Sequence, residues 1–307
     1  MERFTAKDFR PQFAGHETFP LRTLWLKKAF EAVKDGADRN IFVAADAIVR
    51  FGVGKNMAQA MRHWSVATGI IEEVEMRCLP SPLGSAIFAN DGGLDPYLEH
   101  PATLWLIHLA LAGSPEMSTT WYWAFNVFGS LAFDREALTR GLLDIAQERG
   151  WKRVAPVTIK RDVDCFIRSY VARSRGGATE DAIEPILVEL GLIRPSPIGD
   201  AFEFVRGPKA SLPDAVFVIA LDRFWRDAHR EAATLSAEAA CYGRGSPGRV
   251  FKLDEDSVIE RMIRIGETTG GALAWSETAG LKQVVRHRAI DEVAVLQHAF
   301  GIRRRAA

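Results

Sequence analysis

Apolar side chains recur at helical spacing just after the glycine-rich stretch Phe51-Gly-Val-Gly-Lys. Four of them share one face of a predicted amphipathic helix: Met57, Ala60, Met61 and Trp64. We expect Asn56 to cap the start of this helix, with Gln59 completing a capping box, and Gly69 to end it. A shorter helix over 44–50 precedes the glycines, which allow a tight connection between the two helices. The pattern predicts a helix-turn-helix.

Two segments with extended patterning, 69–74 and 79–88, follow the helix-turn-helix. Their polar middle predicts a β wing beside the second helix. In such a unit the second helix enters a DNA groove and the wing lies next to it. We therefore interpret residues 1–98 as a winged helix-turn-helix DNA-binding domain.

The stretch from Gly191 to Phe204 restates the same theme of G-(I/L)-I, then P-S-P-(L/I)-G, then an aromatic residue. Helices are predicted before it over 158–171 and 179–190. The second of these carries four carboxylates that would repel a phosphate backbone: Glu180, Asp181, Glu184 and Glu189. We expect residues 151–235 to form a second winged-helix-like unit that is structural or presents a different face.

Aromatic residues are dense in a helical stretch from His100 to Phe133, between the two units. They include Trp105, Trp121, Trp123, Phe125 and Phe128. A packed core is the favoured interpretation, with a base-stacking platform as the alternative. Residues 99–150 are therefore predicted to be a helical core, and 236–307 a C-terminal helical and extended region with an amphipathic helix over 254–265. The expected fold class is mainly α with small β wings, an α+β protein.

Composition limits the class of protein further. The 307 residues are 48% hydrophobic and carry 39 basic and 39 acidic side chains, so any attraction for DNA must come from local clusters. The apolar runs are far shorter than the roughly 20 residues of a membrane span, and the first residues lack the layout of a secretory signal. The three cysteines form no zinc or disulfide pattern. We expect a cytoplasmic protein without membrane contact.

The stretch around Lys55 resembles a nucleotide-binding phosphate loop only in part. The full motif requires Gly at position 49 and Ser or Thr at position 56, where this sequence has Val49 and Asn56. We therefore expect no bound nucleotide. Contact from Lys55 and Asn56 to a DNA phosphate at the helix N-terminus is the favoured interpretation.

Basic residues gather in two segments. Residues 47–69 contain Arg50, Lys55 and Arg62 and no acidic residue. Residues 149–175 contain only Asp162 and Asp164 against eight basic side chains: Arg149, Lys152, Arg153, Lys160, Arg161, Arg168, Arg173 and Arg175. Such clusters neutralise DNA phosphates, although solvated helix faces produce similar runs.

The segment from Gly15 to Arg22 (GHETFPLR) places a base, a carboxylate, a hydroxyl and a guanidinium within eight residues. It does not extend to H-E-x-x-H, which excludes a zinc-protease site. These residues are equally well explained as caps of a helix predicted over 24–33. Asp162 and Asp164 lie on different faces of their predicted helix, so they are not an obvious metal pair, and ion pairs explain them at least as well. The acidic-x-Lys triplet of common restriction enzymes is absent.

Several motifs taken together resemble DUF4007, a bacterial family of unknown function. They cover most of the chain: GHETFPLR, GVGKNM with RHW, LG-x-x-IF, DPYLEHPATLWLIH, WYWAFN, RDVDCF and TAGLKQ. Phe51 stands where the family is expected to have Leu, a change that affects only packing in the turn. That family is similar to SspB, the nicking component of the Ssp DNA phosphorothioation system. The resemblance implies nicking of double-stranded DNA with a divalent metal, Mg²⁺ or Mn²⁺, alongside a cysteine desulfurase and ATP-dependent components.

On this resemblance we predict His16 as a catalytic base, with Glu17 and Asp162 as catalytic residues and metal ligands. The predicted DNA-binding residues are Arg22, Lys55, Asn56, Arg62, His63, Trp64, Lys160, Arg161, Arg168, Arg173 and Arg175. The expected function is a DNA-nicking endonuclease of an antiphage defence system. The alternative is a non-catalytic winged-helix adaptor or transcriptional regulator.

Overall fold

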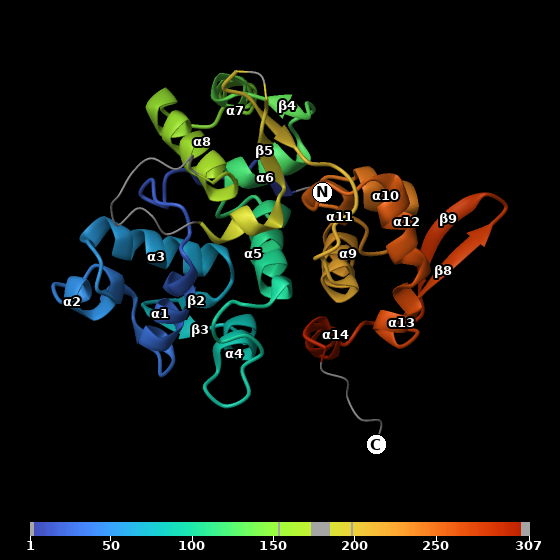
Figure 1. The fold of residues 1–307 in the computed structure, drawn as a ribbon, viewed down its shortest axis with the longest axis horizontal. Helices are drawn as coiled ribbons and strands as arrows, with labels where there is room; N and C mark the ends of the chain where they lie inside the picture. The colour runs from blue at the N-terminus through green and yellow to red at the C-terminus, as the bar shows by residue number, and fades with distance from the viewer. Residues whose placement is uncertain (1–2, 153, 173–184, 198, 302–307) are drawn as a thin grey trace.

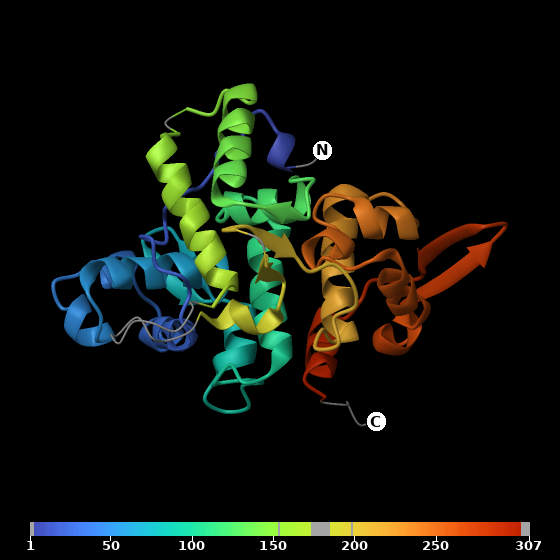
Figure 2. The ribbon, with the colours of Figure 1, turned by 45° about the horizontal axis from the view of Figure 1, so that its top comes forward.

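The computed structural model describes residues 3–152, 154–172, 185–197 and 199–301. Helices surround three small antiparallel sheets, so the protein is a mixed α+β protein, in agreement with the predicted class. The chain runs through three consecutive units along its longest axis, from the blue N-terminal unit to the orange and red C-terminal unit (Figures 1 and 2).

The first unit begins after a short 3-10 helix, η1 (Arg3–Thr5). Its elements are α1 (Thr23–Val33), β1 (Ala37–Asp38), η2 (Arg39–Phe42), α2 (Ala47–Phe51), α3 (Lys55–Ala67), β2 (Ile71–Val74), β3 (Arg77–Pro80) and α4 (Pro82–Phe88). The predicted apolar face of α3 is confirmed, since Ala60, Met61 and Trp64 are fully buried. The predicted Asn56 cap is wrong. Helix α3 begins at Lys55, so Asn56 lies inside the helix, and the residue before the helix, Gly54, provides no side-chain cap.

Helix α4 occupies most of the segment 79–88 that we expected to be extended. The Ser81 hydroxyl accepts a hydrogen bond from the Gly84 N–H at 2.8 Å, and Pro82 fills the first helical position. Both features favour a helix start over a strand. The extended part is therefore confined to the short hairpin of β2 and β3.

The second unit joins segments that are far apart in the chain. Its elements are α5 (Pro101–Gly113), α6 (Thr119–Asn126), β4 (Ala132–Phe133), α7 (Arg135–Glu148), α8 (Pro156–Tyr170), η4 (Ile186–Leu190), β5 (Ile193–Pro195) and β6 (Phe202–Phe204). Ala132 of β4 pairs with Glu203 of β6, so a domain boundary at 150 would divide one sheet. Of the helix predicted over 179–190, the first six residues lie outside the described ranges, and the end is the 3-10 helix η4.

The third unit was predicted only as a helical and extended region. Its elements are α9 (Asp214–Ala228), β7 (Thr234–Ser236), α10 (Ala237–Tyr242), α11 (Pro247–Val250), α12 (Glu255–Ile263), α13 (Ile265–Thr269), β8 (Leu273–Thr278), β9 (Leu281–Arg286) and α14 (Glu292–Ala299). The predicted boundary at 235 falls within β7, which pairs with β9 through Leu235 and Val284. The helix predicted over 254–265 is present as α12.

The three sheets share one topology. In each, the third strand lies between the first and the second: β1-β3-β2, β4-β6-β5 and β7-β9-β8. Helices precede the first strand and fill the connection to the second. A glycine with positive φ stands two residues before each second strand: Gly69 (68°), Gly191 (58°) and Gly271 (75°). The glycine of the predicted internal repeat is therefore present at equivalent positions in the first two units. The third unit is a further copy that we did not predict.

The P-S-P part of the predicted repeat is not equivalent in the two copies. Pro80-Ser-Pro82 ends the third strand of its unit and begins α4, whereas Pro195 ends the second strand, β5, of its unit. Similar sequence therefore serves two different turns.

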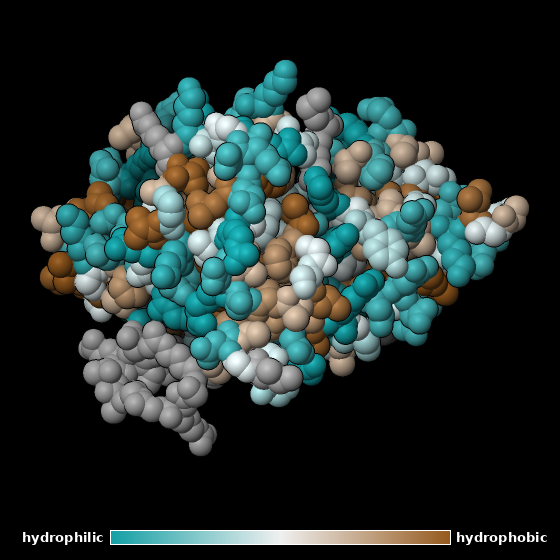
Figure 3. All heavy atoms as spheres, turned by 90° about the horizontal axis from the view of Figure 1, so that it is seen from above, coloured by the Kyte–Doolittle hydropathy of each residue, from teal (hydrophilic) through white to brown (hydrophobic). Residues whose placement is uncertain are grey.

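The aromatic stretch from His100 to Phe133, which lies largely within the second unit, forms core, as favoured. Trp105, Trp121, Trp123 and Phe125 are buried, and nearly every residue of α5 is enclosed. Polar and apolar side chains are interspersed over the face shown in Figure 3. None of the helices in the described ranges has the length and apolar character needed to cross a membrane.

Candidate functional site

An N-terminal loop, residues 12–19, is held against α3, α6 and α8. Nε2 of His16 lies 2.6 Å from Oδ1 of Asp162 on α8. The same oxygen accepts a hydrogen bond from the Ala14 N–H at 2.7 Å. His16 and Asp162 are only 1% and 2% exposed. Two residues that we predicted to be catalytic therefore meet, but in the interior of the protein.

Further hydrogen bonds fix the rest of this loop. They run from the Gln12 N–H to Thr119 Oγ1 (2.8 Å), from Trp64 Nε1 to the Phe19 carbonyl (2.9 Å) and from the Arg168 guanidinium to the Thr18 carbonyl. The loop thus contacts one helix of the first unit and two helices of the second. It joins the two units.

Aromatic rings enclose the His16 imidazole. It stacks on Trp64 with ring centroids 5.7 Å apart, and it meets Trp121 and His63 edge-on at 5.8 and 6.0 Å. Gly15 is required here, because a Cβ at this position would lie 2.4 Å from Nδ1 of His63. This contact accounts for the glycine that precedes the histidine in the GHETFPLR motif.

Opposing contacts set the protonation of the buried histidines. Burial lowers the pKa of His16, but Cys165 and Asp162 outweigh it and raise this pKa to about 10. The Thr18 N–H lies 3.0 Å from Nδ1 of His16 and needs a lone pair there, so this hydrogen bond favours the neutral imidazole with its proton on Nε2. For His63, burial and then the neighbouring His16 lower the pKa to about 3.

The loop backbone is strained beside the buried pair. Ala14, Glu17 and Thr18 have φ of 61°, 49° and 67°, in the left-handed region that costs energy for residues other than glycine. Such conformations persist only when the surrounding structure imposes them, and here Asp162 and Arg168 hold the backbone. The side chain of Glu17 is partly exposed and forms no ion pair with any residue that the structure describes.

Comparison with known proteins bears on this arrangement. The model of a family described as protein of unknown function (DUF4007) matches residues 13–300. The chain belongs to the DUF4007 family. Two crystal structures of SspB, one described as magnesium ion-bound, superpose on this DUF4007 protein with TM-scores of 0.86 and 0.85. Each is 28% identical and covers 98% of this chain and 91% of SspB. A comparison with curated proteins found no match.

The DUF4007 motifs recognised in the sequence converge on the buried histidine. GHET supplies His16, RHW supplies Trp64, WYW supplies Trp121 and RDVDC supplies Asp162. Their common function in this structure is to pack one junction. Asp162 and Cys165 stand three residues apart on α8, and this spacing was the available signal for the contribution of Cys165.

The predicted DNA-binding residues of this DUF4007 protein fall into distinct groups. Those that are exposed are Lys55, Asn56, Lys160 and Arg161. Trp64 is 0% exposed and His63 9% exposed, so our prediction that they contact DNA is wrong: their rings pack against the GHET loop. Arg173 and Arg175 lie outside the described residues.

Three predicted arginines already have partners. Nε and one Nη of Arg62 donate to the two carboxylate oxygens of Glu73 on β2 at 2.5 and 2.7 Å. Arg168 holds the Thr18 carbonyl, and the Arg22 guanidinium lies 5.5 Å from the centre of the Trp25 ring. In this structure these three arginines therefore make contacts that stabilise the fold.

The predicted metal ligands do not form an open metal site in this geometry. Oδ1 of Asp162 is taken by His16 and Ala14, and a hydrated Mg²⁺ would not fit beside a carboxylate that is 2% exposed. Among the described residues no group of three or more His, Cys, Asp or Glu side chains could hold a metal ion. Asp164 is separate, forming an exposed ion pair with Arg135 at 3.0 Å.

Proposed function

We propose that this protein is a DNA-binding, DNA-nicking component of a bacterial DNA phosphorothioation system. The observation that carries the proposal is the likeness to SspB over 98% of the chain at 28% identity. The family resemblance points to the same system, in which the protein acts beside a cysteine desulfurase and ATP-dependent components.

The first unit supports DNA binding. Its helix–turn–helix of α2 and α3, followed by the β2–β3 hairpin, has the order of elements expected of a winged helix-turn-helix, and we include that assignment in the proposal. The N-terminus of α3 has no side-chain cap, and Lys55 and Asn56 are exposed there. Free N–H groups and a lysine at a helix N-terminus favour a DNA phosphate.

Glu17 is the best candidate for the reacting site. This residue is partly exposed, and His16, Asp162 and Arg168 hold the strained backbone around it in place. We therefore assign His16 and Asp162 a positioning role and retain Glu17 as the residue that faces the divalent metal and the DNA. A bound Mg²⁺ or Mn²⁺ would activate water and stabilise charge on the phosphodiester.

A nicking assay tests the proposal. Supercoiled plasmid incubated with the protein and Mg²⁺ or Mn²⁺ should become open circular. Glu17→Gln should abolish nicking while leaving DNA affinity and thermal stability unchanged, and Asp164→Ala serves as a control that removes an exposed carboxylate on α8. Full nicking by Glu17→Gln would refute its assignment.

A non-catalytic DNA-binding adaptor is the second candidate. It is favoured by the burial of His16 and Asp162 and by the lack of a metal-binding group among the described side chains. Plasmid that stays supercoiled with every metal, while the Lys55→Ala/Asn56→Ala variant binds duplex DNA more weakly than the parent protein, would support the adaptor over the nickase.

A further inference from the structure

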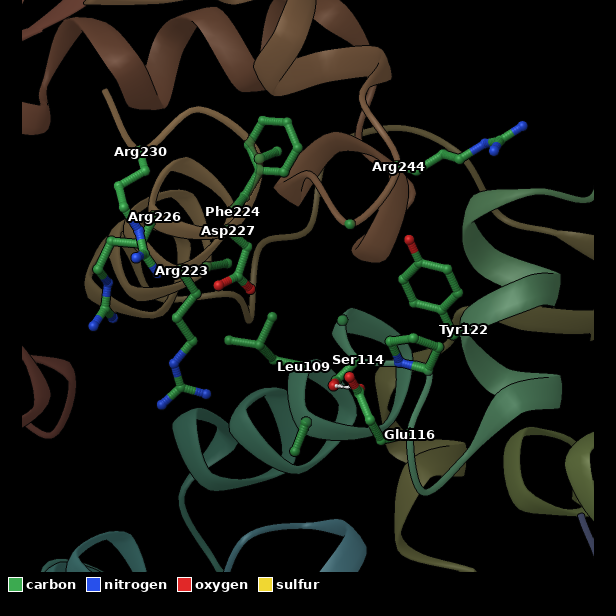
Figure 4. A pocket seen from close by; sticks show the side chains of 16 residues that line it. Leu109, Ser114, Glu116, Tyr122, Arg223, Phe224, Arg226, Asp227, Arg230 and Arg244 are labelled. Carbon is green, nitrogen blue, oxygen red and sulfur yellow. Dashed lines mark hydrogen bonds between the residues drawn. The ribbon is translucent and has the colours of Figure 1, made fainter. Parts of the chain in front are cut away.

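Two hollows in the protein surface differ in how their charges are balanced. In the cavity between α5 and α9 that Figure 4 shows, Arg223 and Arg226 pair with Glu292 of α14 at 2.9 and 3.3 Å, and Arg244 points away from the other labelled side chains. The second hollow is a groove of about 510 Å³ on the first unit, between α1, the end of α2 and the loop that carries Tyr97. Helices α1 and α2 lie at the left in Figure 1.

One wall of the groove is the outer face of α1. Leu24, Lys27, Lys28 and Glu31 line it, and their spacing of three and four residues places them in one stripe along the helix. The opposite face of α1 is buried in the core through Trp25, Leu26, Ala29, Phe30 and Val33. The stripe therefore has no partner within the first unit and is free to contact another molecule.

Large apolar side chains of this groove are open to solvent. Leu24 is 57% exposed and Tyr97 is 66% exposed. On α2, next in sequence to the lining residue Arg50, Ile48 and Val49 are 53% and 86% exposed. Exposed apolar side chains that gather beside a polar rim are typical of protein interaction sites. Covering Leu24 and Tyr97 would therefore stabilise a complex with another protein.

The turn that carries Tyr97 is fixed from within. The Asp95 carboxylate accepts hydrogen bonds from the N–H groups of Glu99 and His100 at 2.9 and 3.0 Å. Leu98 is buried with a φ of 60°, a conformation that costs energy for a leucine and persists only where the surroundings impose it. The neighbours of Tyr97 in the DPYLEH motif thus build the turn, whereas the tyrosine itself stays on the surface and is not used by the proposed function.

Two lysines of α1 bring positive charge to the groove. Nζ of Lys28 donates to the Phe51 carbonyl at 3.0 Å, and Nζ of Lys27 lies 4.7 Å from the centre of the Tyr97 ring. Both partners are uncharged. Neither lysine forms an ion pair with a carboxylate in the part of the chain that the structure describes.

The other charged side chains of the groove already have partners. Arg50 pairs with Asp46 at 2.7 Å, and Glu31 pairs with Lys34 at 3.3 Å. With these partners counted, four basic side chains stand against two acidic ones, so the groove keeps an excess of two positive charges. The two lysines of α1 supply this excess.

We propose that this groove docks a segment of another protein in which large apolar side chains are flanked by carboxylates. The apolar side chains would cover Leu24 and Tyr97, and the carboxylates would lie beside Lys27 and Lys28. The backbone of duplex DNA matches the lysines but offers no apolar surface for Leu24 and Tyr97, which favours a protein partner. The proposal does not depend on nicking by this protein.

Photo-crosslinking of the full chain in the bacterium that encodes it identifies the partner. A p-benzoylphenylalanine at position 97, in place of Tyr97, should crosslink to a protein, and mass spectrometry should locate the crosslink in a segment rich in acidic and large apolar residues. The control carries the same group at position 131, where Leu131 is 51% exposed on the second unit, and should not capture that segment. A crosslink to DNA, to a second copy of this chain or to a segment without acidic residues, or no crosslink at all, would overturn the proposal.

A synthetic peptide with the sequence of the crosslinked segment then measures affinity by fluorescence anisotropy. Lys27→Glu/Lys28→Glu reverses the charge and Leu24→Asp removes an apolar contact, so each should weaken peptide binding about tenfold or more. Leu24 lies in the first turn of α1, where an acidic residue suits the helix dipole, so Leu24→Asp should retain its thermal stability. Leu131→Asp is the matched control and should bind the peptide like the parent protein. Groove variants that bind like this control would refute the proposal.

Duplex DNA separates this site from the proposed DNA-binding site. Leu24→Ala/Tyr97→Ala alters no charge and should weaken peptide binding about tenfold while leaving DNA affinity unchanged. Lys55→Ala/Asn56→Ala should do the reverse. If the groove variant weakened DNA binding and spared the peptide, the groove would belong to the DNA interface and the docking proposal would fail. A parent protein that binds the peptide through the groove but binds no DNA would contradict the proposed function alone.

Discussion

Nε2 of His16 lies 2.6 Å from Oδ1 of Asp162, although 146 positions separate these residues in the chain. The contact is buried on both sides, and it fixes an N-terminal loop to the second unit. Both side chains belong to motifs that suggested catalysis, yet in the structure they first of all hold the molecule together.

Replacing Asp162 with Ala should destabilise the protein by about 3–5 kcal/mol, because it leaves the buried imidazole and the Ala14 N–H without an acceptor. Asp164→Ala removes an exposed pair with Arg135 and should cost less than about 1 kcal/mol. Urea unfolding followed by circular dichroism measures both. Equal losses in the two variants would contradict a stabilising role for the buried pair.

Gly15→Ala should destabilise the protein by about 1–3 kcal/mol, since the new methyl group would overlap the His63 ring. The double variant Gly15→Ala/His63→Ala removes the overlapping ring. It should therefore lose less stability than the sum of the single changes. Additive losses measured by thermal unfolding would show that the two residues do not interact.

Stability should fall as the pH drops below about 6.5. Burial is the main cause that lowers the pKa values of His63 and His108 to about 3, so the unfolded chain takes up protons that the folded protein does not. This stability is therefore present above pH 6.5 and is lost progressively towards pH 3. Each histidine should contribute up to about 1.4 kcal/mol per pH unit.

His108→Gln tests this origin of the pH dependence. The Val250 carbonyl can only accept, so Nε2 of His108 donates to it, and in the neutral ring Nδ1 accepts a hydrogen bond from the Tyr170 hydroxyl. Denaturant unfolding between pH 7 and pH 4 should show a shallower slope for the glutamine variant than for the parent protein. An unchanged slope would assign the acid sensitivity to other groups.

The three left-handed glycines before the second strands should respond alike to alanine. Gly69, Gly191 and Gly271 have open space around the position of a Cβ, so backbone conformation alone sets the cost, about 1–2 kcal/mol each. Gly129→Ala is the control, with open space and no left-handed φ, and should change stability by less than about 0.5 kcal/mol. If Gly271→Ala were as stable as Gly129→Ala, the third unit would not be a copy of the repeat.

Lys55 and Arg62 should separate DNA binding from folding. Lys55→Ala should weaken duplex binding uniformly across sequences and reduce the slope of log affinity against log salt by about one. Arg62→Ala breaks the two hydrogen bonds to Glu73 and should lower stability by about 1 kcal/mol without changing that slope. Fluorescence anisotropy at several salt concentrations distinguishes the two. A salt slope that changes only for Arg62→Ala would reverse their roles.

Local patterns predicted local structure well. The spacing of Met57, Ala60, Met61 and Trp64 placed α3, and the same spacing put Trp64 on its apolar face. A side chain on that face could not also contact DNA, so the two expectations for Trp64 were incompatible. The wing predicted from the sequence is too long, because Ser81 and Pro82 begin a helix within the segment that was expected to be extended.

Long-range partners were beyond what periodicity can supply. No spacing rule connects His16 to Asp162 or β4 to β6, because these contacts depend on how the units fold back on each other. The third unit escaped detection for a different reason. Its repeat signal is a single glycine before Ala272 and Leu273, without the P-S-P that drew attention to the second copy.

The N-terminal loop, which residues of the second unit hold in place, also constrains how the protein folds during its synthesis. His16 leaves the ribosome long before Asp162 is synthesised, so the first unit must wait with its loop unanchored while the second unit is translated. A polypeptide that stops near residue 98 would lack Asp162, Trp121 and Arg168 and would expose the rings that normally enclose His16. The first unit is thus completed by residues that belong to its neighbour, and the order of synthesis determines when that completion can occur.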